Sequence, residues 1–167
     1  MGTIIEQVSF TWDGTILCEQ TTESRVLPHP VTLTWDHNGL RPVAQTERIL
    51  SGGSPQEAID ERFFSIVTDL VGTPSELVTE TGTIAWSTRS TLWGKTTWAT
   101  SSSTYTPLRY PGQYFDPETS LHYNFYRHEM NSKPTRFHFH KETWTFISPT
   151  NTWIVDNAMV RVPLGSK

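Results

Sequence analysis

Hydrophobic and polar residues alternate along much of the chain, as they do in strands that bury one face. In the stretch IIEQVSFTW polar residues separate the apolar ones, and in VTLTW the residues Val31, Leu33 and Trp35 fall on one face. Threonine is frequent in the middle of the chain and favours strands. This pattern predicts an all-β fold.

Glycine-containing pairs follow both of these stretches. Asp13-Gly14 precedes TILCEQTT, and Asn38-Gly39 precedes RPVAQTERIL. Such pairs between alternating runs are strong hairpin signals, because a type I′ turn needs positive φ at both central positions. The chain is therefore expected to begin with two hairpins.

The stretch SGGSPQEAID, residues 51–60, breaks the alternation. Its glycine, serine and proline content favours a surface connection, ending in one helical turn. The run RFFSIVTDLVG that follows is continuously apolar and predicts a strand buried on both faces.

Three fragments share one internal order. FTWDGTILCEQ and LTWDHNGLRPVAQ both place an aromatic residue, an acidic residue, a turn and a strand in sequence, and LVTETGTIAWSTRSTLWG repeats a turn before a strand that contains Trp86. Repeats of this length suggest stacked hairpins, each of which buries its face only against a neighbour.

The residues that follow these repeats carry a family resemblance. FFSIVTDLVGTPSELVTETGTIAWSTRSTLWGKTTW, followed by YTPLRYPGQYFDPETSLHYNFYRH, resembles the Rhs proteins, bacterial relatives of the teneurins built from tyrosine-aspartate (YD) repeats. The resemblance extends from about Phe10 to His128, and its second part is similar to the start of the Rhs repeat-associated core. The signature positions in this chain are Arg109, Pro111, Gly112, Gln113, Tyr114, Asp116, Pro117, Glu118, Thr119, Leu121, Tyr123, Asn124 and Arg127.

The resemblance implies a segment of a large hollow β-shell that encloses a toxin domain of a secreted bacterial polymorphic toxin. Residues 1–50 would supply YD-like hairpins, residues 51–60 the connection, residues 61–128 the core-like region, and residues 129–167 a divergent, irregular tail. The partners implied are the rest of the YD-repeat shell, on the same or an adjacent polypeptide, and the enclosed toxin. Secretion or display would be as part of the larger protein, and a chain made alone would stay in the cytoplasm.

The chain departs from the family pattern at its end. Ser120 stands where the family usually has glycine, and beyond His128 the Asp-Pro turns and tyrosine-rich strands both stop. Asp156 lacks the neighbouring proline and glycine of the family's self-cleavage segment, so self-cleavage is not implied. A shifted reading frame would produce so sharp an edge, and residues after about Met130 are then expected to have no packed role.

Charge and composition narrow the remaining functions. A formal net charge of −4, with 13 Lys and Arg that are scattered, argues against nucleic acid as a partner. The first ten residues lack the pattern of a signal peptide, and no apolar run is long enough to span a membrane. The single cysteine, Cys18, is expected to be a small buried or half-buried side chain rather than a nucleophile.

The candidates for chemistry are few. His138 and His140, at i and i+2 in RFHFHKETW, would share a strand face and are weak candidates for zinc ligands, with His128 and Glu129 upstream. No nucleophile elbow, Walker loop or H-E-x-x-H motif is present, so neither catalysis nor a cofactor is expected. The alternative to a structural role is a free-standing β-rich module that binds glycans, since 7 Trp, 8 Phe and 5 Tyr could form an aromatic platform.

Overall fold

A computed structural model describes residues 5–51, 54–90, 96–116, 121–124, 127–130, 152–155 and 158–161. All regular elements in these ranges are strands, and all of their pairings are antiparallel. The all-β prediction is confirmed. None of the described residues forms a helix that could cross a membrane.

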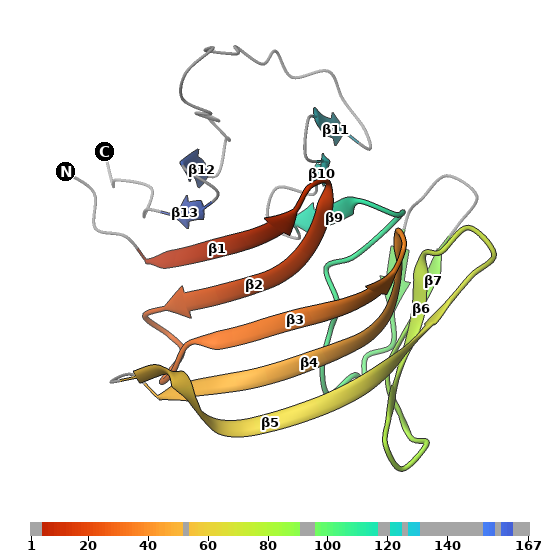
Figure 1. Cartoon of the computed structure of the whole chain (residues 1–167), viewed down its shortest axis with the longest axis horizontal. Helices are drawn as coiled ribbons and strands as arrows, with labels where there is room; N and C mark the ends of the chain where they lie inside the picture. The colour runs from red at the N-terminus through yellow and green to blue at the C-terminus, as the bar shows by residue number, and fades with distance from the viewer. Residues whose placement is uncertain are drawn as a thin grey trace.

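A ten-stranded sheet dominates the molecule (Figure 1). Its strand order is β12-β13-β1-β2-β3-β4-β5-β6-β7-β8, so the chain is a meander from β1 to β8, and two late strands are added beside β1. The strands of this sheet are β1 (Glu6–Asp13), β2 (Ile16–Ser24), β3 (Val31–Asn38), β4 (Arg41–Ser51), β5 (Ser54–Thr68), β6 (Pro74–Thr79), β7 (Ile84–Ser90), β8 (Thr96–Trp98), β12 (Thr152–Val155) and β13 (Ala158–Arg161). A smaller sheet has the order β11-β10-β9 and contains β9 (Gln113–Asp116), β10 (Leu121–Asn124) and β11 (Arg127–Met130).

Both predicted hairpins form, with turns one residue later than expected. Asp13 pairs with Ile16 and Asn38 pairs with Arg41, so Gly14 and Gly39 are the first of two turn residues. Their φ angles are 59° and 62°, a region that glycine enters without steric cost. Glycine at the first central position is the requirement of a type II′ turn rather than of type I′.

The hydrophobic core lies on one face of the large sheet. Phe64, Leu77 and Trp86 from β5, β6 and β7 are almost fully buried there. The segment that follows β8 and ends with β9, residues 99–116, covers this face, and we call it the crossing segment. It contributes Leu108 and Tyr114 to the core.

The long strand β5 differs from both predictions made for its residues. It begins at Ser54, so residues 54–60, expected to be a connection, belong to a strand. Two register shifts opposite Leu50 accommodate this composition, because Leu50 pairs with Ala58 while the next residue pairs with Ser54. The strand is also not buried on both faces, since Phe63 and Val67 point away from the core and are partly exposed.

The region expected to be an irregular tail contains strands. β12 pairs with β13, and β13 pairs with β1 through Glu6↔Arg161 to Ser9↔Ala158. Trp153, Ile154 and Val155, which lie in β12, are apolar and β-favouring residues, so their local propensity favours a strand even though the family pattern has ended. Residues 131–151, Ser120 and Asp156 lie outside the described ranges.

Candidate functional site

The crossing segment is attached at its start to the end of the sheet. The backbone N–H of Ala99 donates to the carbonyl of Ser87 (3.1 Å), and that of Ser103 donates to Ala85 (2.9 Å), both in β7. In Figure 1 the segment then runs behind β3 to β5, across the core face, toward β9. The signature residues therefore reach the sheet through this segment.

Two buried glutamines hold the middle of the crossing segment. Gln45 is 0% exposed; its Oε1 accepts a hydrogen bond from Trp35 Nε1 (2.8 Å) and its Nε2 donates to the carbonyl of Tyr105 (2.9 Å). Gln20, 2% exposed, donates from Nε2 to the Tyr105 hydroxyl (3.4 Å) and to Thr22 Oγ1 (3.0 Å). Tyr105 is 39% exposed as a whole, but desolvation around its hydroxyl raises the pKa of that group, and the hydrogen bond from Gln20 opposes the rise. Both amide groups of Gln45 are therefore satisfied, whereas Gln20 uses only its Nε2, and its buried Oε1 has no hydrogen-bond partner among the described residues.

A carboxylate on β4 holds the neighbouring residues. Glu47 is buried, and its Oε2 accepts a hydrogen bond from Thr104 Oγ1 (2.8 Å), while its Oε1 forms an ion pair with Arg62 Nη2. Arg62 also donates from Nη1 to the carbonyl of Ser103 (3.3 Å). The sheet thus provides a row of polar groups that match the backbone and side chains of residues 103–105.

Arg109, the first signature residue, is 5% exposed. Its Nη1 donates to the carbonyls of Thr106 (3.0 Å) and Leu108 (2.7 Å), and its guanidinium lies over the Phe115 ring, 4.7 Å from the centroid. Desolvation lowers the pKa of Arg109 to about 10, and Tyr114 opposes this shift. Both of these hydrogen bonds come from one nitrogen, and the contact of the flat guanidinium with the Phe115 ring is the feature that favours arginine over lysine here.

Pro111 and Gly112 form a tight turn. Gln113 N donates to the Tyr110 carbonyl (2.7 Å), and Gly112 has φ of 80°, as a type II turn with proline at its second position requires. Leu108 then pairs with Tyr114, and Arg109 N donates to Gln113 O (3.0 Å), so the signature residues form a small hairpin. We call residues 110–113 the signature turn.

The signature turn lies where three turns of the large sheet meet. A Cβ on Gly112 would lie 3.8 Å from the Thr15 carbonyl in the β1–β2 turn. A Cβ on Gly72, in the β5–β6 turn, would lie 3.2 Å from Pro111 Cγ and 3.8 Å from Arg41 Nε at the β3–β4 turn. The positive φ of Gly112 is what favours glycine at that position, because 3.8 Å is an ordinary contact, whereas the 3.2 Å approach to Pro111 leaves little room for a Cβ on Gly72.

The remaining signature residues build the smaller sheet. Tyr114 is buried and meets Phe10 edge to face, with ring centroids 4.9 Å apart, and Asp116 is buried. The pairings Leu121↔Asp116, Tyr123↔Tyr114, Asn124↔Gln113 and Asn124↔Arg127 bring signature residues opposite one another. Pro117, Glu118 and Thr119 lie outside the described residues, as do Phe125 and Tyr126.

No group of three potential metal ligands occurs among the described residues, and His138 and His140 lie outside them. Cys18 is half-buried, with Sγ 3.6 Å from the carbonyl of Ile16. The crevice beside the signature turn, lined in part by Leu17, His37 and Pro111, holds about 10 Å³. Pockets for small molecules measure roughly 300–1,000 Å³.

The contacts with the crossing segment involve residues that the sequence patterns had not singled out: Gln20, Gln45, Glu47, Arg62 and Thr104. A signal for two of them was present. Each glutamine stands six residues after its hairpin glycine, Gly14 and Gly39 respectively. The two glutamines occupy equivalent positions when the hairpins are aligned on their glycines, but not when they are aligned on their Trp-Asp pairs.

Comparison with known proteins agrees with this geometry. The family model described as RHS protein matches residues 64–99. The chain is 32% identical over 131 residues to the double-stranded DNA deaminase toxin A of Burkholderia cenocepacia, a match that spans 73% of this chain and 9% of that protein. It is 32% identical over 127 residues to the probable deoxyribonuclease RhsA of Dickeya dadantii, across 74% of this chain and 8% of that protein.

Solved structures share the fold. The Photorhabdus luminescens Tc holotoxin pore matches 75% of this chain and 6% of its own, with a TM-score of 0.53 and 20% identity. The crystal structure of TcdB2-TccC3-TEV matches 76% of this chain and 7% of its own, with a TM-score of 0.52 and 16% identity. The family match and the two relatives show that the chain belongs to the Rhs protein family.

Proposed function

We propose that this chain is a structural segment of the wall of an Rhs shell that encloses a toxin domain, with no enzymatic activity of its own. The observation that carries the proposal is that the buried polar groups bind the crossing segment to the sheet. Gln20, Gln45 and Glu47 all hold the crossing segment against the sheet. Their hydrogen bonds stabilise a curved wall with its cover and leave no reactive constellation among the described residues.

The relatives support a structural role for the shared segment. One is named a DNA deaminase and another a probable deoxyribonuclease, yet both match nearly the same share of this chain at 32% identity. A segment common to proteins with different named activities accounts for neither activity. The chain spans only 8–9% of these relatives, so the toxin and most of the wall would be supplied by other parts of a larger protein.

In this proposal the signature residues, Arg109 to Arg127, close the wall. Residues 1–50 provide hairpin repeats and residues 61–128 the core-like region, with β5 joining the two. The partners are the remaining shell and the enclosed toxin domain of a secreted bacterial protein. The proposed role involves neither zinc nor another cofactor, and no nucleic acid partner.

A glycan-binding module, the alternative function, requires aromatic rings exposed in a row. Trp35, Trp86 and Phe64 are instead buried in the core, and Tyr114 packs against Phe10. Their burial favours the wall over the platform.

A segment exchange tests the proposed function. The stretch of the Burkholderia cenocepacia deaminase toxin A that matches this chain would be replaced by the chain, with an unrelated β-domain of equal length as the control. We expect the exchanged protein to keep a protease-resistant shell around its toxin domain and the control to lose it. An exchanged protein that is cleaved as fast as the control would contradict the proposal, as would retention of the purified chain on polysaccharide columns.

A further inference from the structure

Two turns of the large sheet have the same hydrogen-bonding geometry, but one carries polar residues at its tip and the other apolar residues. In the β5–β6 turn, Asp69 N donates to Thr73 O (2.9 Å) and Gly72 N to Asp69 O (3.1 Å). In the β6–β7 turn, Thr79 N donates to Thr83 O (2.9 Å) and Gly82 N to Thr79 O (2.9 Å). Both are three-residue hairpin loops with glycine last and positive φ, 102° for Gly72 and 80° for Gly82.

The residues at the tips differ. The β6–β7 turn carries Glu80 and Thr81, as expected for a turn in water, whereas the β5–β6 turn carries Leu70 and Val71. Leu70 is 98% exposed and Val71 is 63% exposed. Since the β6–β7 turn forms the same hydrogen bonds with polar residues, the turn geometry does not require the apolar pair.

The polar groups near this tip are turned toward the backbone. Asp69 Oδ1 accepts hydrogen bonds from the N–H groups of Val71 (2.9 Å), Gly72 (2.9 Å) and Thr73 (2.8 Å). Arg41 Nη2 donates to the carbonyl of Leu70 (3.4 Å). The tip therefore presents aliphatic side chains with little free charge, which fits an apolar protein surface better than a glycan or a nucleic acid.

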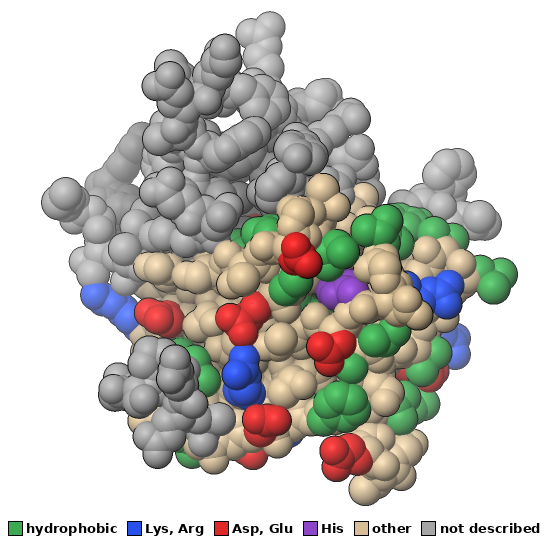
Figure 2. Space-filling model, viewed as in Figure 1, with side chains coloured by type: hydrophobic (Ala, Val, Ile, Leu, Met, Phe, Trp, Pro, Cys, Tyr) green, Lys and Arg blue, Asp and Glu red, His purple; other side chains and the backbone are tan. Residues whose placement is uncertain are grey.

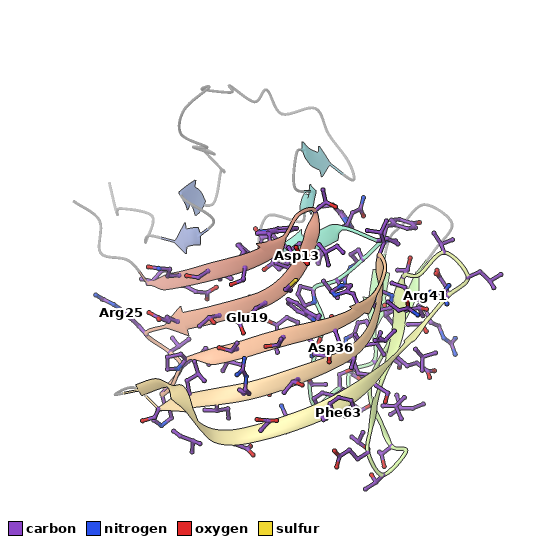
Figure 3. The ribbon with its side chains drawn as sticks, in the orientation of Figure 1. Asp13, Glu19, Arg25, Asp36, Arg41 and Phe63 are labelled. Atoms are coloured by element: carbon purple, nitrogen blue, oxygen red, sulfur yellow. The ribbon has the colours of Figure 1, made fainter. Side chains whose placement is uncertain are left out.

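The tip continues the interface already described at the signature turn. Gly72 lies against Pro111, and Arg41 joins the β3–β4 turn, where Leu40 is also exposed, to the β5–β6 turn. We call Leu40, Leu70 and Val71 the apolar rim. Figure 1 shows the β5–β6 turn protruding at the right, Figure 3 places Arg41 beside it, and in Figure 2 hydrophobic side chains gather on that side of the molecule. The backbone that carries Leu70 and Val71 is thus linked to the signature turn through Gly72 and to the β3–β4 turn through Arg41.

We propose that the apolar rim is a docking surface for neighbouring hairpins of the same Rhs polypeptide, which pack apolar side chains onto Leu70 and Val71. This inference rests on the proposed function: the matched segments are 9% and 8% of the two relatives, so a wall that contains this chain continues well beyond it. Exposed aliphatic side chains on two turns that a hydrogen bond from Arg41 joins are a candidate contact site, because large exposed apolar patches mark such sites. Because the apolar rim adjoins the signature turn, which belongs to the proposed wall, the neighbouring part of the wall is the occupant that we favour.

The first test gives the rim the sequence of the β6–β7 turn. The double variant Leu70→Glu/Val71→Thr would be made in the isolated chain and in the exchanged deaminase toxin A. We expect the unfolding midpoint of the isolated chain to stay unchanged, while protease cleavage of the exchanged shell becomes at least about tenfold faster, because two aliphatic side chains lose their burial. Glu80→Gln/Thr81→Ser, at the matched turn, should leave both properties unchanged.

The outcomes separate the two proposals. If the exchanged protein without the rim variant forms no protected shell, the proposed function fails and the rim proposal fails with it. If that shell forms and the double variant protects the toxin equally well, only the rim proposal is overturned. A lower unfolding midpoint of the isolated chain with the double variant would show that Leu70 and Val71 stabilise its own fold, and would also overturn the proposal.

A cross-linking experiment identifies the occupant. A photoreactive benzoyl-phenylalanine would replace Leu70 in the exchanged protein, with Glu80 as the matched position, and cross-linked peptides would be identified by mass spectrometry. We expect the Leu70 probe to capture shell peptides outside the exchanged segment, with a yield several-fold above that of the Glu80 probe. Capture of the toxin domain, capture of a second copy, or equal yields from both positions would overturn the proposal.

Discussion

Gln20 and Gln45 occupy the same position in successive hairpins, each six residues after the turn glycine, and both donate to Tyr105. One bonds the hydroxyl of that tyrosine and the other its carbonyl. The hairpin repeat therefore does more than supply apolar residues to the core. It presents a buried amide at a fixed interval, and the crossing segment is placed where one residue can use two of them.

Replacement of Gln45 tests this arrangement. Gln45→Ala would leave Trp35 Nε1 and the Tyr105 carbonyl without their partners, and we expect the free energy of unfolding to fall by about 2–4 kcal/mol. Gln20→Ala should cost about 1 kcal/mol, because its bond to Tyr105 is longer and ends on a hydroxyl. Urea unfolding measures both, and Gln7→Ala, on a half-buried site of β1, should change stability by less than about 0.5 kcal/mol. Equal effects at positions 7 and 45 would contradict the role given to Gln45.

The two matched glycines provide a second test. Gly82→Ala should cost about 1 kcal/mol, because φ is 80° but no atom lies within 4 Å of the new Cβ. Gly72→Ala should cost about 2–3 kcal/mol, because the Cβ would also press on Pro111 Cγ at 3.2 Å.

A double-mutant cycle separates strain from contact. In a Pro111→Ala background the cost of Gly72→Ala should fall toward that of Gly82→Ala, which gives a coupling of about 1 kcal/mol. Additive effects of the two changes would mean that the signature turn and the β5–β6 turn are not in contact.

The hairpins could be predicted from the sequence because each carries a local signal, the glycine at Gly14 or Gly39. The path of the crossing segment could not, because residues 99–112 have no periodicity and their place depends on distant groups such as Glu47 and Gln45. A glutamine inside a strand is most often half-exposed, so a single sequence gives no reason to expect one at 0% exposure. The opposite holds for Phe63 and Val67, which are apolar but partly exposed. In sequence, apolar side chains on the outer face of a strand look the same as buried ones, so the run containing them predicts a strand buried on both faces.

The pH dependence of stability should reflect His37, which is half-buried near the signature turn. Desolvation lowers its pKa below the usual 6.5, although a hydrogen bond with the Trp35 backbone and the charge of Asp36 oppose the shift. The unfolded chain therefore binds this proton first as pH falls, and this group lowers stability progressively below about pH 6.5, until the folded form is protonated too. Urea midpoints at pH 7.5 and 5.5 should differ less in His37→Gln than in the parent; an identical difference would exclude His37 as a contributor.

The late strands provide the last test, because the ending of the family pattern and the structure give opposite expectations for them. The end of the pattern near His128 predicts no packed role beyond Met130, whereas β13 pairs with β1 over Glu6 to Ser9. Truncation after Met130 would make β1 a terminal strand and leave backbone groups of these residues open to water. The amides of Glu6 to Ser9 that point toward β13 are therefore expected to be protected from hydrogen exchange in the full chain and to exchange many times faster in the truncated one. Amides of Glu19 to Thr22, which pair with β3, should change little. Equal exchange at Glu6 to Ser9 in both proteins would contradict the pairing and would support a shifted reading frame as the origin of the tail, because a sequence that arose in that way has no reason to complement β1.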